Sequence, residues 1–292
     1  MDTTWRIEIE GPGAEDLAFD CSFSQVARIR GVEVLADHSV RLFVSATEGQ
    51  RDQLLRLLAE KRFVVRAVDA EESCDWEAAV KNSWVPFSAG SFEVVPVLDE
   101  KPPARTPDQK QILLRPGVGF GTGHSQTTQS ALLCLDAVAG STHRPEKIID
   151  IGTGSGILAI AAAKLFPKSS LHGIDVQEAA LENAIGNVAL NGLSPRISLT
   201  LGDPESAQDA YGLIIANLDI GIHLSILGEY NRLAAPHAQL IVAGVRDSVT
   251  AAQFSDLLHN EALTGWDSTH QWQLLHCVES GEWKAFLFTK VE

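Results

Sequence analysis

The pattern of apolar and polar residues changes character twice along the chain. Near the beginning, apolar residues alternate with polar ones as they do in strands, at residues 5–10, 41–45 and 63–68. Leucines recur at helical spacing within residues 50–61. Between residues 76 and 110 the pattern weakens and prolines accumulate, which is typical of a linker. We therefore predict an α+β domain over residues 1–75, a linker over residues 76–110 and a second domain over residues 111–292.

In the second domain, apolar strands alternate with helical patterns, which predicts a parallel sheet with helices on both faces. The expected strands cover residues 147–151, 170–174, 196–201, 212–217 and 239–245. Helices are expected after the first, second, fourth and fifth of these strands, and the clearest covers residues 178–190. Residues 269–278 and 283–290 flank a short turn that contains glycine, so we expect the sheet to end in an antiparallel hairpin.

Composition and charge narrow the possible functions. The 292 residues are 45% hydrophobic and 21% charged, which is typical of a folded globular protein. Lys and Arg number 23 against 38 Asp and Glu, a formal net charge of −15 that disfavours direct nucleic-acid binding and favours a basic partner. The four cysteines are far apart and predict neither a metal site nor a disulfide framework. With no leader pattern and no long apolar run, we expect a cytoplasmic monomer outside the membrane.

The strongest local signal is the segment Asp150-Ile151-Gly152-Thr153-Gly154-Ser155-Gly156, in which an apolar strand runs into a Gly-rich turn that opens an Ala-rich helix. Glycines at the carboxyl end of a first strand allow a ligand to approach the backbone, and the helix offers unpaired N–H groups. The spacing G-x-G-x-G departs from the dinucleotide fingerprint G-x-G-x-x-G. Gly152, Gly154 and Gly156 are therefore candidate cofactor contacts, and an ordinary tight turn is the alternative.

Polar residues close three of the later strands. Asp175 could accept hydrogen bonds from the hydroxyls of a ribose, or it could cap the following helix. Asp203 could lie near an adenine ring, but the pair Asp203-Pro204 favours a turn. Asn217 could accept an N–H from an attacking amine, or it too could cap a helix. We expect the reacting group at Asn217.

Upstream of the sheet, residues 117–123 contain four glycines and precede a helical run over residues 129–138. This segment is too rich in glycine for a strand and could form a flap in which Phe120 packs on a ligand. Thr127 or Thr128 could donate a hydroxyl to the ligand, or could merely cap the helix. His124 could act on the substrate, although a lone loop His more often packs or forms hydrogen bonds.

Together these residues resemble the bacterial PrmA family, the methyltransferases that modify the eleventh protein of the large ribosomal subunit. The resemblance extends from about residue 76 to the C-terminal part of the chain. Its motifs are the flap from Gly119 to His124 with Thr127-Thr128, the Gly-rich loop, Asp175, Ala216-Asn217-Leu218 and Gly281-Glu282-Trp283. This sequence departs from the family pattern at Ser125-Gln126, where relatives often carry His, Pro or Glu.

The resemblance implies a class I methyltransferase fold with a Rossmann-like, seven-stranded sheet and a small ferredoxin-like N-terminal domain that recognises the protein substrate. It implies S-adenosylmethionine as cofactor and a basic ribosomal protein of the large subunit as partner, methylated on lysine ε-amines or an α-amine. By residue, it implies cofactor contacts at Thr128, Gly152, Asp175 and Asn217, with Asn217 also facing the amine. Phe120 and His124 are assigned to the flap and substrate side.

Methyl transfer from a sulfonium releases a neutral thioether, so the reaction needs no acid, and we assign no general base and no metal. Three alternatives stay open. The first is a class I methyltransferase that acts on another protein or a small molecule, because the cofactor motifs do not encode the acceptor. The others are an NAD(P)-dependent oxidoreductase, which predicts the absent G-x-G-x-x-G spacing, and a non-catalytic module that binds an adenosyl group.

Overall fold

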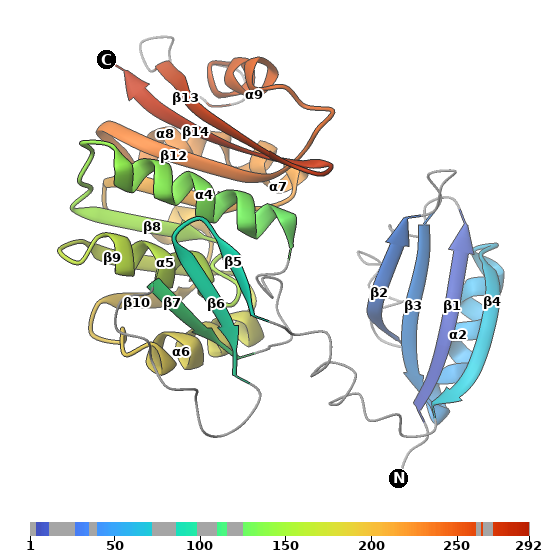
Figure 1. Ribbon diagram of the computed structural model, residues 1–292. Helices are drawn as coiled ribbons and strands as arrows, with labels where there is room; N and C mark the ends of the chain where they lie inside the picture. Colours follow the sequence, from blue (N-terminus) through green and yellow to red (C-terminus); the bar gives the residue numbers. More distant parts are fainter. Residues whose placement is uncertain are drawn as a thin grey trace. The chain divides into compact units, whose positions relative to one another are not determined.

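The computed structural model describes residues 4–11, 27–34, 40–71, 86–97, 110–115, 125–260, 264 and 271–291. The chain divides into two compact units, Met1–Ser83 and Trp84–Glu292. Figure 1 labels the elements of both units.

The first unit contains an antiparallel sheet of four strands in the order β2-β3-β1-β4. The strands are β1 (Thr4–Gly11), β2 (Arg28–Val34), β3 (Val40–Thr47) and β4 (Val64–Glu71). Helix α2 (Glu48–Glu60) begins with a capping box in which the Thr47 side chain and Gln50 bond each other's backbone. Apolar residues from the sheet and from α2 form the core of this unit, including Ile7, Ile9, Val44, Leu54 and Leu58.

This strand order is compatible with the expected ferredoxin-like domain. Residues 12–26, which join β1 to β2, lie outside the described residues. The ferredoxin-like assignment of the first unit therefore stays a prediction.

The second unit begins within the segment that the sequence predicts as a linker. Strands β5 (Phe87–Ala89), β6 (Phe92–Pro96) and β7 (Lys110–Leu114) form a small sheet, with β5 antiparallel and β7 parallel to β6. Phe92, Val94, Ile112 and Leu114 are buried in the core of this unit. Residues 87–96 thus belong to the folded unit, although short strands broken by polar residues give little periodicity in the sequence.

The main sheet of the second unit has seven strands in the order β10-β9-β8-β11-β12-β14-β13. They are β8 (Lys147–Ile151), β9 (Ser170–Asp175), β10 (Ile197–Leu201), β11 (Tyr211–Asn217), β12 (Ala234–Arg246), β13 (Gln271–Ser280) and β14 (Trp283–Val291). The first five in the order are parallel, and β14 is antiparallel to both β12 and β13. The predicted sheet and its closing hairpin are confirmed, with a tighter turn of only Gly281 and Glu282.

Helices cover both faces of this sheet (Figure 1). They are α4 (Gln126–Gly140), α5 (Ile157–Leu165), α6 (Glu178–Leu190), α7 (Ile220–Ser225), α8 (Leu227–Leu233) and α9 (Ala251–Leu258). One core joins α4 and α5 to strand residues such as Ile148 and Ile215. The other joins α8 and α9 to their strand neighbours Ile149 and Ile214, which point to the opposite face.

The strand order reverses direction between β8 and β11, the neighbours at the middle of the sheet. Connections from these two strands leave toward opposite sides, which opens a crevice outside their carboxyl ends. The loop after β8 and Asn217 at the end of β11 meet at this edge. The fold therefore brings the predicted Gly-rich loop and the predicted reacting residue to one place.

Candidate functional site

The loop after β8 is shaped by the absence of side chains. Gly152, Gly154 and Gly156 all have positive φ, at 68°, 55° and 81°. A Cβ atom on Gly152 would overlap Cδ2 of Leu218, the residue that follows Asn217. Helix α5 then starts with Gly156 as its N-cap and no side chain capping it. The loop thus packs directly against the end of β11, and its glycines let a ligand approach the backbone closely.

Asp150, inside β8, is a site residue that sequence reasoning did not select. It is 2% exposed, and its Oδ2 accepts hydrogen bonds from the Thr153 hydroxyl (2.7 Å) and the Ala159 N–H (3.1 Å). Its Oδ1 is buried without a hydrogen-bond partner in the described structure. Burial raises the pKa of this carboxyl to about 6. An acceptor oxygen without a hydrogen-bond partner, just before the Gly-rich loop, is suited to a cationic or N–H-bearing ligand group.

Asp175, at the end of β9, braces the same loop. Its Oδ2 accepts the Gly154 N–H at 2.8 Å and its Oδ1 accepts the Gln177 N–H at 2.9 Å. The N-cap of α6 is Gln177, and Asp175 is 8% exposed, so the alternative of an exposed helix cap at Asp175 is wrong. Each carboxylate oxygen has a second acceptor site, so the side chain can still bind ligand hydroxyls.

Asn217, the last residue of β11, contacts the first turn of α4. Its Nδ2 donates to the Thr128 hydroxyl at 3.3 Å, although 89 residues separate the two in the chain. The N-cap of α7 is Asp219, so the capping alternative for Asn217 is wrong. The Oδ1 atom of Asn217 lies on the side of β12, near Gly244.

Thr128 is held in turn by Ser125. Helix α4 begins at Gln126, three residues before the predicted start, with Ser125 as its N-cap. The Ser125 Oγ lies 2.8 Å from the Thr128 Oγ1 and accepts the Thr128 N–H at 3.3 Å. Thr128 itself is 1% exposed. Ser125, where the sequence departs from the family pattern, therefore serves as a helix cap. The predicted flap residues Phe120 and His124 lie outside the described residues.

Gly244, near the end of β12, is a second position that sequence reasoning missed. It has φ of 83° at a bulge in the pairing of β12 with β14. A Cβ there would overlap the carbonyl oxygen of Leu218 and would lie 3.3 Å from Asn217 Oδ1. A lone glycine inside the apolar run from Leu240 to Val245 was the available signal, because an interior strand glycine often marks a bulge or a close approach.

Asn187, in α6, connects the Gly-rich loop to the end of β7. It is fully buried, and its Nδ2 donates to the Ser155 carbonyl at 2.9 Å. Its Oδ1 accepts the Arg115 N–H at 2.7 Å. One turn later, Asn191 bonds both the N–H and the C=O of Leu113. The two asparagines therefore hold Leu113 and Arg115, at the end of the described segment that precedes the predicted flap.

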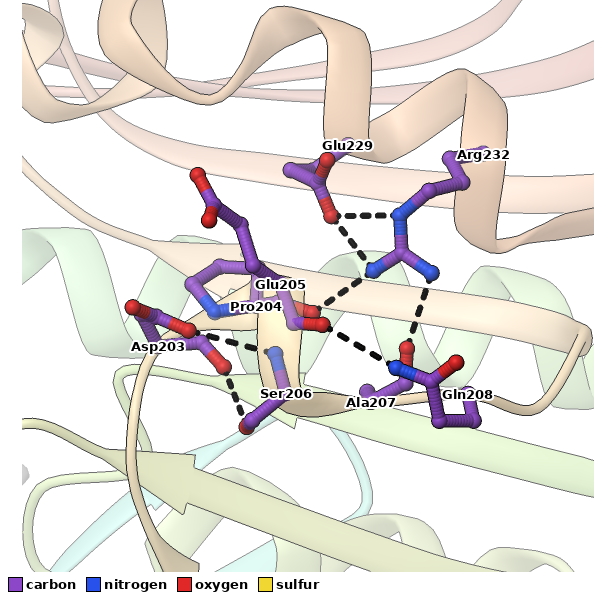
Figure 2. Close-up of polar contacts among 8 residues, drawn as sticks. All are labelled: Asp203, Pro204, Glu205, Ser206, Ala207, Gln208, Glu229 and Arg232. Carbon is purple, nitrogen blue, oxygen red and sulfur yellow. Dashed lines mark hydrogen bonds and ion pairs between the residues drawn. The ribbon is translucent and has the colours of Figure 1, made fainter.

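The turn after β10 is held from a distant helix, as Figure 2 shows. Asp203 caps the short 3₁₀ helix Pro204–Ser206, accepting the Ser206 N–H at 3.1 Å, so the predicted Asp-Pro turn is confirmed. Arg232 of α8 donates to the carbonyls of Pro204 and Ala207, both at 2.8 Å, and pairs with Glu229. These hydrogen bonds of Arg232 hold the turn after β10, next to Asp175 at the edge of the sheet.

Within the described ranges, no three His, Cys, Asp or Glu residues are grouped so that they could hold a metal ion. Nor does any described helix have the length and apolar character needed to cross a membrane.

The sheet order, the Gly-rich loop after β8 and the polar residues at the carboxyl edge define the class I methyltransferase fold. The chain belongs to the family described as "Ribosomal protein L11 methyltransferase (PrmA)", whose model matches residues 24–291. The expected fold class and family are thereby confirmed.

Individual relatives agree with this membership. The ribosomal protein L11 methyltransferase of Exiguobacterium sibiricum is 34% identical over 202 residues, covering 66% of this chain and 62% of its own length. That of Deinococcus radiodurans is 36% identical over 202 residues, covering 64% of this chain and 71% of its own length. The crystal structure of a ribosomal protein L11 methylase from Lactobacillus delbrueckii subsp. bulgaricus has a TM-score of 0.56 and 28% identity, covering 69% of this chain and 96% of that one. The match therefore spans less than two thirds of the first relative.

Proposed function

We propose that the protein transfers methyl groups from S-adenosylmethionine to amines of ribosomal protein L11, on lysine ε-amino groups, an α-amino group or both. The observation that carries the proposal is the Asn217 side chain at the carboxyl edge of the sheet, whose nitrogen donates to Thr128 and whose oxygen lies near Gly244 of β12. Family membership and the names of the relatives support the acceptor. The net charge of −15 favours a basic partner.

The donor groups at the site fit the proposed cofactor. Asp175 offers a nearly buried carboxylate suited to the two hydroxyls of a ribose. The unpartnered Oδ1 of Asp150 is an acceptor suited to the ammonium group of the methionine part. Gly152 and the start of α5 allow close approach of the ligand to the backbone. When bound, the cofactor would supply an activated methyl group on a positively charged sulfur.

The residues at the edge of the sheet would then act mainly by positioning. Holding the amine nitrogen in line with the methyl carbon removes the entropy cost of a bimolecular encounter, an effect that can reach about 7 kcal/mol. The amine must be neutral to attack, whereas a free lysine has a pKa of about 10.4. Asn217 Oδ1 would accept an N–H of the amine and so aim its lone pair, and the surplus proton would leave through water.

No general base is required, and the described histidine nearest in the chain to Asn217 does not supply one. Both ring nitrogens of His223 are engaged inside the protein, with Tyr230 and with Ala243. The acid Asp175 is engaged by two backbone N–H groups. Deprotonation by desolvation therefore accounts for the reaction better than a dedicated base.

We further propose that the first unit recognises the protein substrate and that the enzyme acts in the cytoplasm, where ribosomal proteins are made. Among the described residues, the two hydrophobic cores of the second unit are formed by residues of that unit, so removal of residues 1–83 is a practicable test. We expect that deletion to raise the KM for L11 and to leave cofactor affinity unchanged. Unchanged values of both would assign substrate recognition to the second unit.

Intact-mass spectrometry of purified L11, incubated with this protein with and without S-adenosylmethionine, tests the function. We expect cofactor-dependent mass steps of one CH₂ each. L11 with acetylated amines is the matched control and should show none. If the cofactor binds and L11 gains no mass, the acceptor is a different molecule. If S-adenosylmethionine does not bind, the methyltransferase function itself is wrong, and nicotinamide dinucleotides become the next ligands to titrate.

A further inference from the structure

A buried histidine lies one helical turn beyond the reacting edge and has no part in the chemistry above. His223 of α7 is fully buried, with Nε2 2.9 Å from the Ala243 carbonyl oxygen and Nδ1 2.6 Å from the Tyr230 hydroxyl. The ring of Phe254 meets it edge-on at 5.7 Å between centroids. A polar ring enclosed this completely needs a partner for each nitrogen, and it has both.

The two contacts fix the protonation of the imidazole. A carbonyl oxygen can only accept, so Nε2 must carry a proton and donate it to Ala243. Nδ1 then accepts the hydrogen of the Tyr230 hydroxyl. Burial lowers the pKa of His223 to about 4, in agreement with a neutral ring at physiological pH. His223 is therefore a fixed hydrogen-bond donor.

The carbonyl that receives this bond also holds the loop after β11. Ala243 is the register partner of Asn217 in the parallel pair of β11 and β12. Its carbonyl oxygen accepts the Leu218 N–H at 3.1 Å, so the two lone pairs of that oxygen are filled by Leu218 and His223. The bulge at Gly244 provides the space, because no side chain fits between Gly244 and the Leu218 carbonyl.

We propose that His223 is a positioning residue for Asn217, acting through the Ala243 carbonyl that both His223 and Leu218 bond. The inference rests on the proposed function, because it assigns to His223 the orientation of the side chain that receives the amine. His223 does not touch the substrate. It sets where β11 ends and hence where the Asn217 carboxamide points.

The test uses variants of the full chain that remove or retain the donor. His223→Phe combined with Tyr230→Phe removes both members of the pair, so no hydroxyl is left buried without a partner. We expect kcat for L11 methylation to fall about tenfold or more, because a small misplacement of reacting groups is costly, with the KM for S-adenosylmethionine changed less than about twofold. The single variant His223→Gln keeps Tyr230 and supplies an N–H donor in place of the imidazole, so it should recover most of kcat.

A second histidine–tyrosine pair, which lies on strands β9 and β11, is the matched control. His172 Nδ1 lies 2.9 Å from the Tyr211 hydroxyl, and its Nε2 lies 3.0 Å from the Thr200 hydroxyl, away from Ala243. His172→Phe combined with Tyr211→Phe makes the same chemical change. It should lower the melting temperature and leave kcat at the wild-type value.

Hydrogen exchange of the Leu218 amide gives a readout that does not depend on activity. In the His223 double variant, protection of this amide should fall relative to that of Ile215 within β11, and His223→Gln should restore it. A folded double variant with unchanged kcat and unchanged Leu218 protection overturns the positioning role. If wild type does not methylate L11, the proposed function fails separately, and Leu218 exchange alone decides whether His223 holds the loop.

Discussion

Two loops meet at the carboxyl edge of the sheet, and they are built in opposite ways. The loop after β8 makes room with glycines, because three of its five residues are glycines at positive φ and the last of them is the N-cap of α5. The loop after β11 presents one side chain, Asn217, held by Thr128 and by the end of β12. The first is specified by a run of neighbouring residues, and the second by residues distant in the sequence.

The difference separates two tasks. A glycine-rich loop suits a cofactor that must lie against the backbone, whereas a fixed carboxamide suits a group that must be aimed. Changes in the first loop should therefore abolish cofactor binding. Changes in the second should slow the transfer step and leave binding largely intact.

The largest effect is expected from Gly152→Val. A β-branched residue at φ of 68° is strained, and its Cβ would overlap Leu218. We expect S-adenosylmethionine affinity to fall more than about 100-fold, a loss typical of severe backbone strain combined with a steric clash. Gly186→Val, on α6 where no atom lies near the added Cβ, is the matched control and should bind normally in calorimetry. Tight binding by the Gly152 variant would show that this loop is not the cofactor site.

The next largest effect is expected from Asn217→Ala. Loss of a positioned polar group at a reacting centre typically costs about 100-fold in kcat, with little change in cofactor affinity. Asn217→Asp keeps an acceptor oxygen and loses the N–H that bonds Thr128, so it should retain more activity than the alanine variant. Single-turnover methylation of L11 measures both. Full activity of Asn217→Ala would remove Asn217 from the mechanism.

Asp150→Asn should show that the buried carboxyl of Asp150 in β8 has a cost in stability that depends on pH. The folded-state pKa of about 6 lies above the ordinary 3.8, so the folded protein binds more protons between these values and loses stability as pH rises through this window. Asn cannot ionise, so the free energy of unfolding of this variant should rise relative to that of wild type from pH 4 to pH 7, by at most about 3 kcal/mol.

Urea unfolding at several pH values measures this gain. His223 contributes the opposite slope, since its pKa is lowered from 6.5 to about 4 and its stability contribution falls as pH drops through that range. The contribution of His223 is common to both proteins and cancels in the difference. A difference that does not vary with pH would contradict the raised pKa of Asp150.

The smallest effect is expected from Thr128→Val, which keeps the shape of the side chain and removes the hydroxyl that Asn217 contacts. The Thr128 hydroxyl also contacts Ser125, as that of Thr127 does, so the contact with Asn217 distinguishes the two threonines. Loss of that contact, about 1 kcal/mol, should lower kcat roughly fivefold. Thr127→Val is the control, because the hydroxyl of Thr127 contacts the Ser125 side chain and not Asn217. Equal losses in the two variants would mean that the start of α4, not the contact with Asn217, sets the rate.

Sequence reasoning recovered what depends on neighbouring residues. Strand β8 lies at its predicted residues because a run of five residues, three of them isoleucine, leads directly into the glycines. Asp175 and Asn217 were placed at one edge because parallel strands end together. Both depend on short-range pattern and on a general rule of sheet topology.

What sequence reasoning missed depends on contacts between distant segments. The contact between Asn217 and Thr128 spans 89 residues, and that between His223 and Ala243 spans 20. In the sequence, Asn187 is an ordinary polar residue of a helix, whereas in the structure it is buried and bonds Ser155 and Arg115. No periodicity signals such contacts, because they arise only when the sheet order brings the segments together.

That sheet order also determines when the site can form during synthesis. Strand β14 lies between β12 and β13, so β13 cannot join the sheet until residues 283–291 have left the ribosome. The turn that joins β13 to β14 contacts the start of α4, because a Cβ on Gly281 would overlap the Gln126 side chain, two residues before Thr128. A nascent chain that lacks β14 therefore has its Gly-rich loop but lacks a strand on which α4, the helix that carries Thr128, packs. Cofactor binding should be acquired earlier in translation than the ability to transfer a methyl group.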